Sequence, residues 1–249
     1  MSHRESGGSP NYSFKPSVKA VWLFAVFFPL FVALGFWQLQ RADEKVALNV
    51  LRDTRSQEPP RSLKDVAAEV LDDLRYRPVW MEGQYDTAHQ FLLDNQLQGQ
   101  SVGYQVLTPL RLSGMDKAVL VNRGWVPQGS SRRVLPNIDQ APPGTMKVIG
   151  IVERFHRVGF QLEGADIPAD GWPSVVQLPQ AEKLAERLGY SVLPYQVLLD
   201  PAADGGYSRV WQVVRLDSDK NRGYALQWFL FAGLVTFFFV RYSFKAKSG

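Results

Sequence analysis

The side chains that most often carry out catalysis or bind metals are scarce in this sequence. It has three histidines, His3, His89 and His156, and no cysteine. No two histidines have the spacing of a helical metal site, and a chain without cysteine cannot build a thiolate-ligated zinc site or a copper relay. It also lacks a nucleophile elbow, a phosphate-binding loop and a dinucleotide fingerprint. These absences predict a protein that is not an enzyme and has no metal site.

The remaining candidates for acid–base chemistry lie in sequence surroundings that are typical of solvent-exposed residues. Asp72 and Asp73 are adjacent carboxylates in a polar segment, where a solvated surface is far more common than a catalytic pair. His89 lies near Asp86 and Asp94, and His156 lies among basic residues. Both histidines are therefore interpreted as surface residues.

Basic residues without acidic neighbours lie beside two apolar segments of the chain. The formal net charge is +4. Basic residues flank the outer ends of the apolar segments without an acidic neighbour, at Lys15, Lys19, Arg241, Lys245 and Lys247. Elsewhere acidic and basic residues are mixed, whereas a nucleic-acid-binding protein concentrates its basic residues on one surface. The distribution predicts a membrane topology and no nucleic-acid partner.

Both apolar segments are long enough to cross a membrane as helices. Residues 20–39 contain no charge, and at about 1.5 Å per residue they span about 30 Å. Residues 224–242 are apolar up to Val240, and the side chain of Arg241 can extend to the lipid headgroups. A cleaved signal peptide is the alternative for the first segment, but its apolar residues continue past the small residues Ala33 and Gly35.

The basic flanks predict the orientation, because lysine and arginine are enriched on the cytoplasmic side of membrane helices. Residues 1–19 and 243–249 are expected to be cytoplasmic tails, and residues 40–223 a periplasmic domain. The expected location is a bacterial inner membrane, crossed twice.

The domain between the two segments is expected to be α+β, with a mainly antiparallel sheet and a few helices. Residues 41–55 continue the first helix as a stalk that Pro59 and Pro60 end, and residues 66–74 and 181–188 have helical spacing. The expected strands are rich in valine, leucine and aromatic residues and are separated by turn-forming residues. They are 78–85, 90–94, 104–112, 118–125, 146–153, 195–199 and 208–214. Such a sheet could close into a small barrel.

Aromatic and amide side chains gather at the expected periplasmic ends of the two spans. Trp37 and Gln38 end the first, whereas Tyr224, Gln227 and Trp228 share a helical face at the start of the second. The two glutamines are expected at a similar depth, and could line one site. An ordinary interfacial belt is one interpretation. A surface for haem or for a partner helix is the other.

Six sequence segments, taken in order, form a recognisable pattern. They are GFWQLQR at 35–41, GQYD at 83–86, FLLDNQ at 91–96, VLTPL at 106–110, VLVNRGWVP at 119–127 and GYALQWF at 223–229. In their order, their spacing and the two-span layout, the chain resembles the surfeit locus protein 1 family of cytochrome c oxidase assembly factors, and looks like a bacterial-type member.

The resemblance implies a non-enzymatic chaperone of the respiratory chain that assists the assembly of haem-copper cytochrome c oxidase. Its implied partners are oxidase subunit I, haem a synthase and membrane lipid, and its implied transient ligand is haem a. Many members carry a histidine, thought to ligate haem, just before the glycine and tyrosine of the second helix. Asn221 occupies that position here, and an amide is a poor replacement for imidazole on iron. Haem ligation is therefore not extended to this chain.

Within VLVNRGWVP, the residues Asn122, Arg123, Gly124 and Trp125 form the candidate domain motif. Gly124 permits a tight exit from the strand. Arg123 is expected to be either a buried structural cation paired with a carboxylate or a contact for a ligand or partner.

Two other classes of function stay open at the level of sequence. The first is a membrane-anchored periplasmic enzyme, against which the missing catalytic constellation argues. The second is a structural scaffold whose helices only hold other membrane proteins together.

Overall fold

The computed structural model describes residues 12–129, 134–138, 141–155, 164, 166–211 and 216–246. The chain forms two compact units, one from residues 1–51 together with 214–249 and the other from residues 52–213. Two long helices near the chain ends and a mixed-sheet domain with few helices confirm the predicted α+β class.

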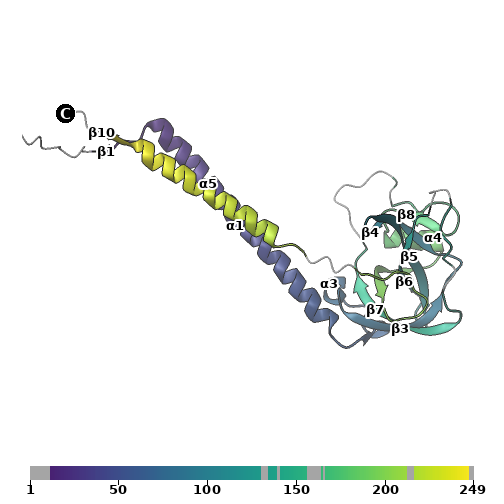
Figure 1. Ribbon diagram of the computed structural model, residues 1–249. Helices are drawn as coiled ribbons and strands as arrows, with labels where there is room; N and C mark the ends of the chain where they lie inside the picture. Colours follow the sequence, from purple (N-terminus) through teal and green to yellow (C-terminus); the bar gives the residue numbers. More distant parts are fainter. Residues whose placement is uncertain are drawn as a thin grey trace, which may run out of the picture. The chain divides into compact units, whose positions relative to one another are not determined.

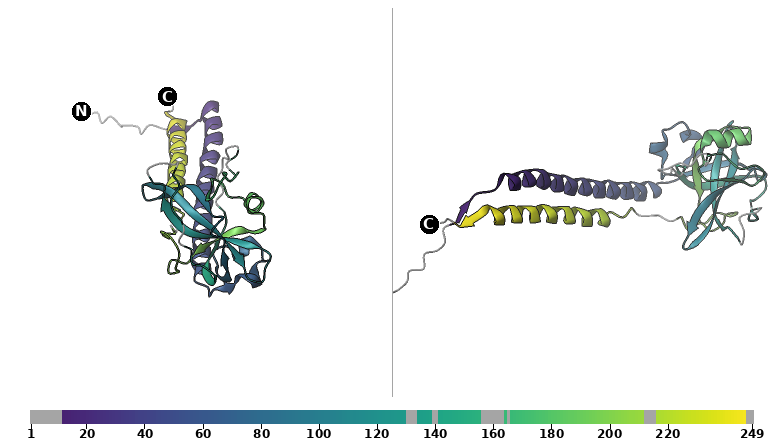
Figure 2. Two further views of the ribbon diagram at one scale, coloured as in Figure 1. Left: turned by 90° about the vertical axis from the view of Figure 1, so that its right-hand side faces the viewer. Right: turned by 90° about the horizontal axis from the view of Figure 1, so that it is seen from above.

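The first unit is an antiparallel pair of long helices, α1 (Val18–Ser56) and α5 (Asp219–Ser243), which lie side by side in Figures 1 and 2. The ring of Phe24 stacks on that of Phe239 at 4.5 Å between centroids. A Cβ atom added to Gly35 would lie 2.6 Å from the ring of Phe229, so glycine permits a close approach of the helices there. Aromatic rings therefore form part of the contact between the two helices.

Both helices are long and apolar enough to cross a membrane. Only 6% of the most apolar stretch of α1 and 11% of that of α5 are buried. A core helix of a soluble protein would be mostly covered, whereas a membrane helix presents its apolar side chains to lipid. The predicted stalk is confirmed, because α1 continues to Ser56.

A short two-stranded sheet lies at one end of the helical pair. Strand β1 (Tyr12–Phe14) pairs antiparallel with β10 (Phe244–Ala246), and the amide of Lys15 donates a 2.7 Å hydrogen bond to the carbonyl of Ser243. The chain segments that lead into α1 and out of α5 therefore lie at the same end of the pair. This small sheet was not predicted from the sequence.

The second unit is built on a sheet that closes on itself. Its strand order is β2-β3-β7-β9-β6-β5-β4-β8, and a further pairing of β3 with β5 closes the five strands from β3 to β5 into a barrel. The barrel strands are β3 (Pro78–Tyr85), β7 (Thr145–Glu153), β9 (Val192–Leu199), β6 (Ala118–Pro127) and β5 (Ser101–Leu112). Strands β2 (Arg61–Ser62), β4 (Phe91–Gln98) and β8 (Ser174–Val176) extend the sheet.

Pairing between barrel strands is antiparallel except for β6 with β9. Alternate side chains of β3, including Val79 and Met81, belong to the main core, and so do Val119 and Val121 of β6. This is the period of two expected for a strand with one face turned inward. Arg123 continues the same alternation along β6, and this places a cation among the inward-facing residues.

The predicted helix at 181–188 is confirmed as α4 (Ala181–Leu188), which ends at Gly189 in the left-handed conformation with φ 75°. Leu184 of α4 packs with Leu107 and Leu120 in a second core cluster. These two residues lie on strands β5 and β6, so α4 covers the outer face of the sheet.

Two predicted elements are wrong. Residues 66–74 do not form one helix but belong to two single turns, α2 (Leu63–Val66) and α3 (Leu71–Leu74), separated by the extended backbone of Val70. The break lets Leu63 and Leu74 both reach the main core. In the expected last strand, Ser208 forms an isolated bridge with Trp125, and residues 209–211 form no strand. Residues 212–215 lie outside the described residues.

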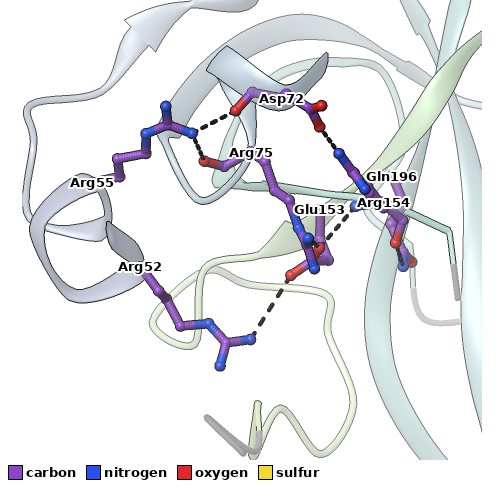
Figure 3. A network of polar contacts seen from close by, with 7 residues as sticks. All are labelled: Arg52, Arg55, Asp72, Arg75, Glu153, Arg154 and Gln196. Carbon is purple, nitrogen blue, oxygen red and sulfur yellow. Dashed lines mark hydrogen bonds and ion pairs between the residues drawn. The ribbon is translucent and has the colours of Figure 1, made fainter. Parts of the chain in front are cut away.

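The end of α1 is attached to the barrel by arginines (Figure 3). Arg55 donates to the carbonyl of Asp72 at 2.6 Å, and the guanidinium of Arg52 lies 3.8 Å from the carboxylate of Glu153. Arg75 also contacts Glu153, at 2.7 Å. The final turn of α1 therefore belongs structurally to the second unit.

Candidate functional site

A groove of about 460 Å³ lies between α1 and α5 in the first unit. The α1 residues that line it are three or four positions apart, which places them on one helical face. The lining residues are Trp37, Gln38, Arg41, Glu44, Lys45, Leu48, Asn221 and Tyr224. The groove thus combines aromatic, amide and cationic side chains at the point where the apolar part of α1 ends.

A chain of hydrogen bonds crosses this groove. The Nζ atom of Lys45 donates to Oδ1 of Asn221 at 2.7 Å and to the carbonyl of Asp217 at 3.0 Å. The Nδ2 atom of Asn221 donates to Oε1 of Gln38 at 2.6 Å. Both polar atoms of the Asn221 side chain are therefore engaged, and their partners fix the direction in which the amide points.

A second set of hydrogen bonds extends the contact between the helix pair and the segment before α5. The Nδ2 atom of Asn49 donates to the carbonyl of Leu216 at 3.1 Å, and the amide of Leu216 donates back to Oδ1 of Asn49 at 3.0 Å. The carboxylate of Asp217 accepts from the amide of Asp219. Backbone donation from Lys220, at the start of α5, is the main cause that lowers the pKa of Asp217.

The groove carries an excess of positive charge. Arg41 and Lys45 are cations, and Glu44 is the one anion among the lining residues. Arg41 and Glu44 form an ion pair at 2.9 Å, and both side chains are largely exposed, so this pair contributes little to stability. The charge of Lys45 has no carboxylate partner among the described ion pairs, and its partners are amide and carbonyl oxygens.

The aromatic and amide residues predicted at the periplasmic ends of the two spans lie in different surroundings. Trp37, Gln38 and Tyr224 line the groove. Gln227 is exposed and is absent from the lining. Trp228 packs against Phe31 at 5.7 Å between ring centroids, deeper along the pair. Gln38 meets Asn221 rather than Gln227.

Lys45 was missed by the sequence reasoning. It follows Gln38 by seven positions and Arg41 by four, so the helical spacing that placed Gln38 on one face also places Lys45 there. That signal was available in the sequence. The rotation of α1 relative to α5, which turns this face toward Asn221, was not.

The groove offers no imidazole to a haem iron. Its lining contains no histidine, and the side chain of Asn221 is an amide whose two polar atoms are already bonded to Lys45 and Gln38. Imidazole, thiolate, thioether and phenolate are the usual protein ligands of haem iron, and of these the groove lining contains only the phenol of Tyr224. His89, the histidine within the described residues, belongs to the second unit and has its Nδ1 atom 2.9 Å from Asp86.

Arg123 of the domain motif is fully buried, with 0% of its surface exposed. Its Nε atom donates to the carbonyl of Gly205 at 2.7 Å, and its Nη1 atom donates to Oε1 of Gln90 at 3.2 Å. The rings of Tyr85 and Tyr207 lie 5.5 and 5.1 Å from the guanidinium carbon. Burial lowers the pKa of Arg123.

The expected burial of Arg123 is confirmed, but the expected carboxylate partner is wrong. Within the described part of the chain, carbonyl, amide and hydroxyl oxygens take its place. Because a buried arginine without its acceptors is costly, these contacts hold the segment around Gly205 against the barrel. The side chain is a structural cation.

Trp125 and Gly124 of the motif also contact the segment that follows Gly205. The amide of Trp125 donates to the carbonyl of Ser208 at 2.8 Å, and the amide of Tyr207 donates to the carbonyl of Arg123 at 2.7 Å. Gly124 has φ +114°, and an added Cβ would lie 2.8 Å from the carbonyl oxygen of Ser208.

Asn122 is buried and donates to Oε1 of Gln105 at 2.9 Å and of Gln196 at 3.0 Å. Its Oδ1 atom accepts from the amide of Gly124 at 3.2 Å. All four residues of the motif therefore have structural contacts, and the groove of the first unit is the more accessible polar site.

Comparison with known proteins gives a consistent result. The family model described as the SURF1 family matches residues 25–233. A SURF1-like protein of Rickettsia conorii is 28% identical over 158 residues, which is 62% of this chain and 62% of the relative. Surfeit locus protein 1 of Mus musculus is 30% identical over 135 residues, which is 48% of this chain and 43% of the relative.

A SURF1-like protein of Monosiga brevicollis is 26% identical over 225 residues, which is 81% of this chain and 79% of the relative. The chain thus spans about 62% of the Rickettsia conorii relative and less of the mouse protein. Because the family model covers the first helix, the barrel and most of α5, this chain belongs to the SURF1 family.

Proposed function

We propose that this chain is a non-enzymatic membrane factor for the assembly of haem-copper cytochrome c oxidase. The groove end of the helical pair, with Trp37, Gln38 and Tyr224, is the surface through which it acts. The observation that carries the proposal is the hydrogen-bonded chain of Lys45, Asn221 and Gln38 in this groove. Membership of the SURF1 family, known as cytochrome c oxidase assembly factors, supports it.

The proposed partners are oxidase subunit I, haem a synthase and membrane lipid. The exposed apolar faces of α1 and α5, including Leu226 and Leu230, suit contact with other membrane helices, which pack through van der Waals contacts and interhelical hydrogen bonds. Haem a enters the proposal only as cargo of the partners, because the groove lacks an imidazole.

The proposed location is a bacterial inner membrane with both termini in the cytoplasm and the barrel in the periplasm. The paired strands β1 and β10 support a common side for the two termini. The basic residues next to these strands, including Lys15 and Arg241, support the cytoplasm as that side.

Complementation of a bacterial strain that lacks its own family member tests the proposal. The wild-type chain should restore oxidase activity and the oxidase absorption spectrum of the membranes. Gln38→Leu should lower both, because leucine cannot accept the hydrogen bond from Asn221. Leucine is well tolerated at a membrane boundary, so the protein level should stay unchanged.

The matched control is Gln227→Leu, an identical substitution at an exposed position outside the groove, which should complement fully. Equal oxidase levels with both variants would place the working surface elsewhere. Failure of the wild-type chain to raise oxidase levels at normal expression would contradict the assembly function itself.

A further inference from the structure

The groove contains hydrogen-bond donors that the described residues do not use. A lysine ammonium has three N–H groups, and Lys45 donates to two acceptors, Asn221 and the carbonyl of Asp217. The oxygen of the Gln38 amide accepts from Asn221, and no hydrogen bond from the Gln38 amide nitrogen is found among the described residues. With the net positive charge of the lining residues, these donors suit an anion.

The depth of these donors matches the headgroup layer of a membrane. The apolar segment of α1 ends at Leu39, and Arg41 and Lys45 follow about 3 Å and about 9 Å further along the helix axis. Lipid headgroups occupy a layer of about 5 to 8 Å on each side of the hydrocarbon core. Arg41 therefore lies within the headgroup layer. The backbone of Lys45 lies just outside this layer, but the Lys45 ammonium contacts Asn221, which also contacts Gln38 at the inner edge of the layer.

We propose that the groove between α1 and α5 binds the headgroup of an anionic phospholipid, with Lys45 and Gln38 as its main contacts. The exposed apolar surfaces of Phe36 and Leu226 offer places for the acyl chains. This inference rests on the proposed function, whose partners include membrane lipid, and names the lipid class and its contacts. It is tested without an oxidase, so its failure can be distinguished from failure of the assembly function.

The orientation of Asn221 has a specific part in this site. Because Asn221 donates to Gln38 through Nδ2, the oxygen of the Gln38 amide is occupied and its nitrogen is left as the free end. Lys45 in turn engages the oxygen of Asn221. The chain of hydrogen bonds thus occupies the oxygens of Gln38 and Asn221 and leaves donors of Gln38 and Lys45 for a ligand.

The proposal is tested by native mass spectrometry of the full chain in mild detergent. The protein is titrated with dioleoyl phosphatidylglycerol, which is anionic, and separately with dioleoyl phosphatidylcholine, which has the same acyl chains and no net charge. The wild-type chain should retain one phosphatidylglycerol molecule in preference to phosphatidylcholine. Metal-free mesoporphyrin IX, an apolar dicarboxylate without iron, is added as a competitor.

Two variants separate the headgroup contact from general damage. Lys45→Met should weaken phosphatidylglycerol binding by about fivefold, the effect of one cation near an anionic lipid surface. Gln38→Glu keeps an oxygen that accepts from Asn221, but replaces the free donor with a negative charge. It should weaken binding at least as much while phosphatidylcholine binding stays unchanged.

The matched control is Arg222→Gln, which removes a cation from the first turns of α5. Arg222 is exposed, is paired with Asp219 at 3.8 Å and does not line the groove. Its loss should leave phosphatidylglycerol binding within about twofold of the wild type. An equal loss of phosphatidylglycerol binding for Arg222→Gln and Lys45→Met would show that the lipid preference comes from general surface charge, and would overturn the proposal.

Two further results would also overturn it. In the first, the wild-type chain binds both lipids equally. In the second, mesoporphyrin IX displaces phosphatidylglycerol at equimolar concentration, in which case the anion that the groove recognises is a porphyrin carboxylate.

Discussion

The side chain of Lys45 on α1 donates a 2.7 Å hydrogen bond to Asn221, which lies near the start of α5. These residues are 176 positions apart in the sequence. The contact engages the oxygen of the residue that stands where many family members have a histidine. It therefore explains why this position can belong to a polar network and need not bind a metal.

The absence of an imidazole at position 221 leads to a spectroscopic prediction. When the full chain is purified from cells that synthesise haem a, it should show no stoichiometric Soret band, since the groove supplies no imidazole. Asn221→His provides the comparison, because it places an imidazole there. A wild-type spectrum of bis-histidine haem that disappears on replacement of His89 and His156 would contradict this assignment.

Gly124 should be sensitive to substitution. Gly124→Ala places a Cβ at a residue with φ +114° and 2.8 Å from the carbonyl oxygen of Ser208. We expect a loss of about 2 to 4 kcal/mol in the free energy of unfolding, from backbone strain and steric overlap together. Urea unfolding of the full chain in detergent, followed by tryptophan fluorescence, measures this loss.

The control for this measurement is Gly129→Ala. Gly129 also has a positive φ, +76°, but no atom lies within 4 Å of an added Cβ. Its substitution should cost only about 1 kcal/mol, the strain of the left-handed conformation. Similar losses at both positions would show that the approach of Ser208 to Gly124 does not limit the size of this residue.

Local patterns predicted the barrel strands better than the contacts between distant segments. The alternation in residues 78–85 and the helical spacing in residues 181–188 each correspond to one observed element. Closure of the barrel depends instead on the pairing of Gly83 with Leu112 and of Tyr85 with Leu110. Alternation within one strand does not reveal such a pairing, nor the register shifts between β5 and β6 and between β6 and β9.

In the candidate site, too, the local helical pattern was predicted but the contact between distant residues was not. Helical rise predicted a similar depth for Gln38 and Gln227, but Gln38 contacts Asn221, which lies six residues, or about 9 Å, before Gln227 along α5. The stacking of Phe24 on Phe239 and the close approach of Gly35 to Phe229 belong to this alignment of the helices, which the sequence did not reveal. As a result Gln38 contacts Asn221, and Gln227 stays outside the groove.

Tyr195 offers a simple test of the barrel core. Its hydroxyl is buried without a hydrogen-bond partner among the described residues, and the side chain is only 2% exposed. An unpaired buried hydroxyl is destabilising. Tyr195→Phe should therefore raise the free energy of unfolding by about 1 kcal/mol. A loss of stability of that size would show that the hydroxyl has a partner in solution.

Buried tyrosines should make the domain sensitive to alkali. Burial raises the pKa of Tyr85 to about 12, whereas a tyrosine in the unfolded chain titrates near 10. The folded state therefore keeps its proton between pH 10 and 12 while the unfolded state loses it. Stability from this group is complete below about pH 10 and falls by about 2 to 3 kcal/mol as the pH approaches 12.

Urea unfolding of the wild type and of Tyr85→Phe at pH 8, 10, 11 and 12 measures this dependence. The variant should lose less stability between pH 10 and 12 than the wild type. Tyr224→Phe, at an exposed position of α5, should behave like the wild type. Parallel pH profiles for the wild type and Tyr85→Phe would exclude Tyr85 as a source of the alkaline loss.

The most direct test of the assembly function is co-purification of the tagged full chain from membranes of cells that are synthesising oxidase. Subunit I should be enriched with the wild-type chain relative to a tagged, unrelated two-span membrane protein, and depleted with Gln38→Leu at equal protein levels. No enrichment of subunit I with the wild-type chain would contradict the assignment as an oxidase assembly factor.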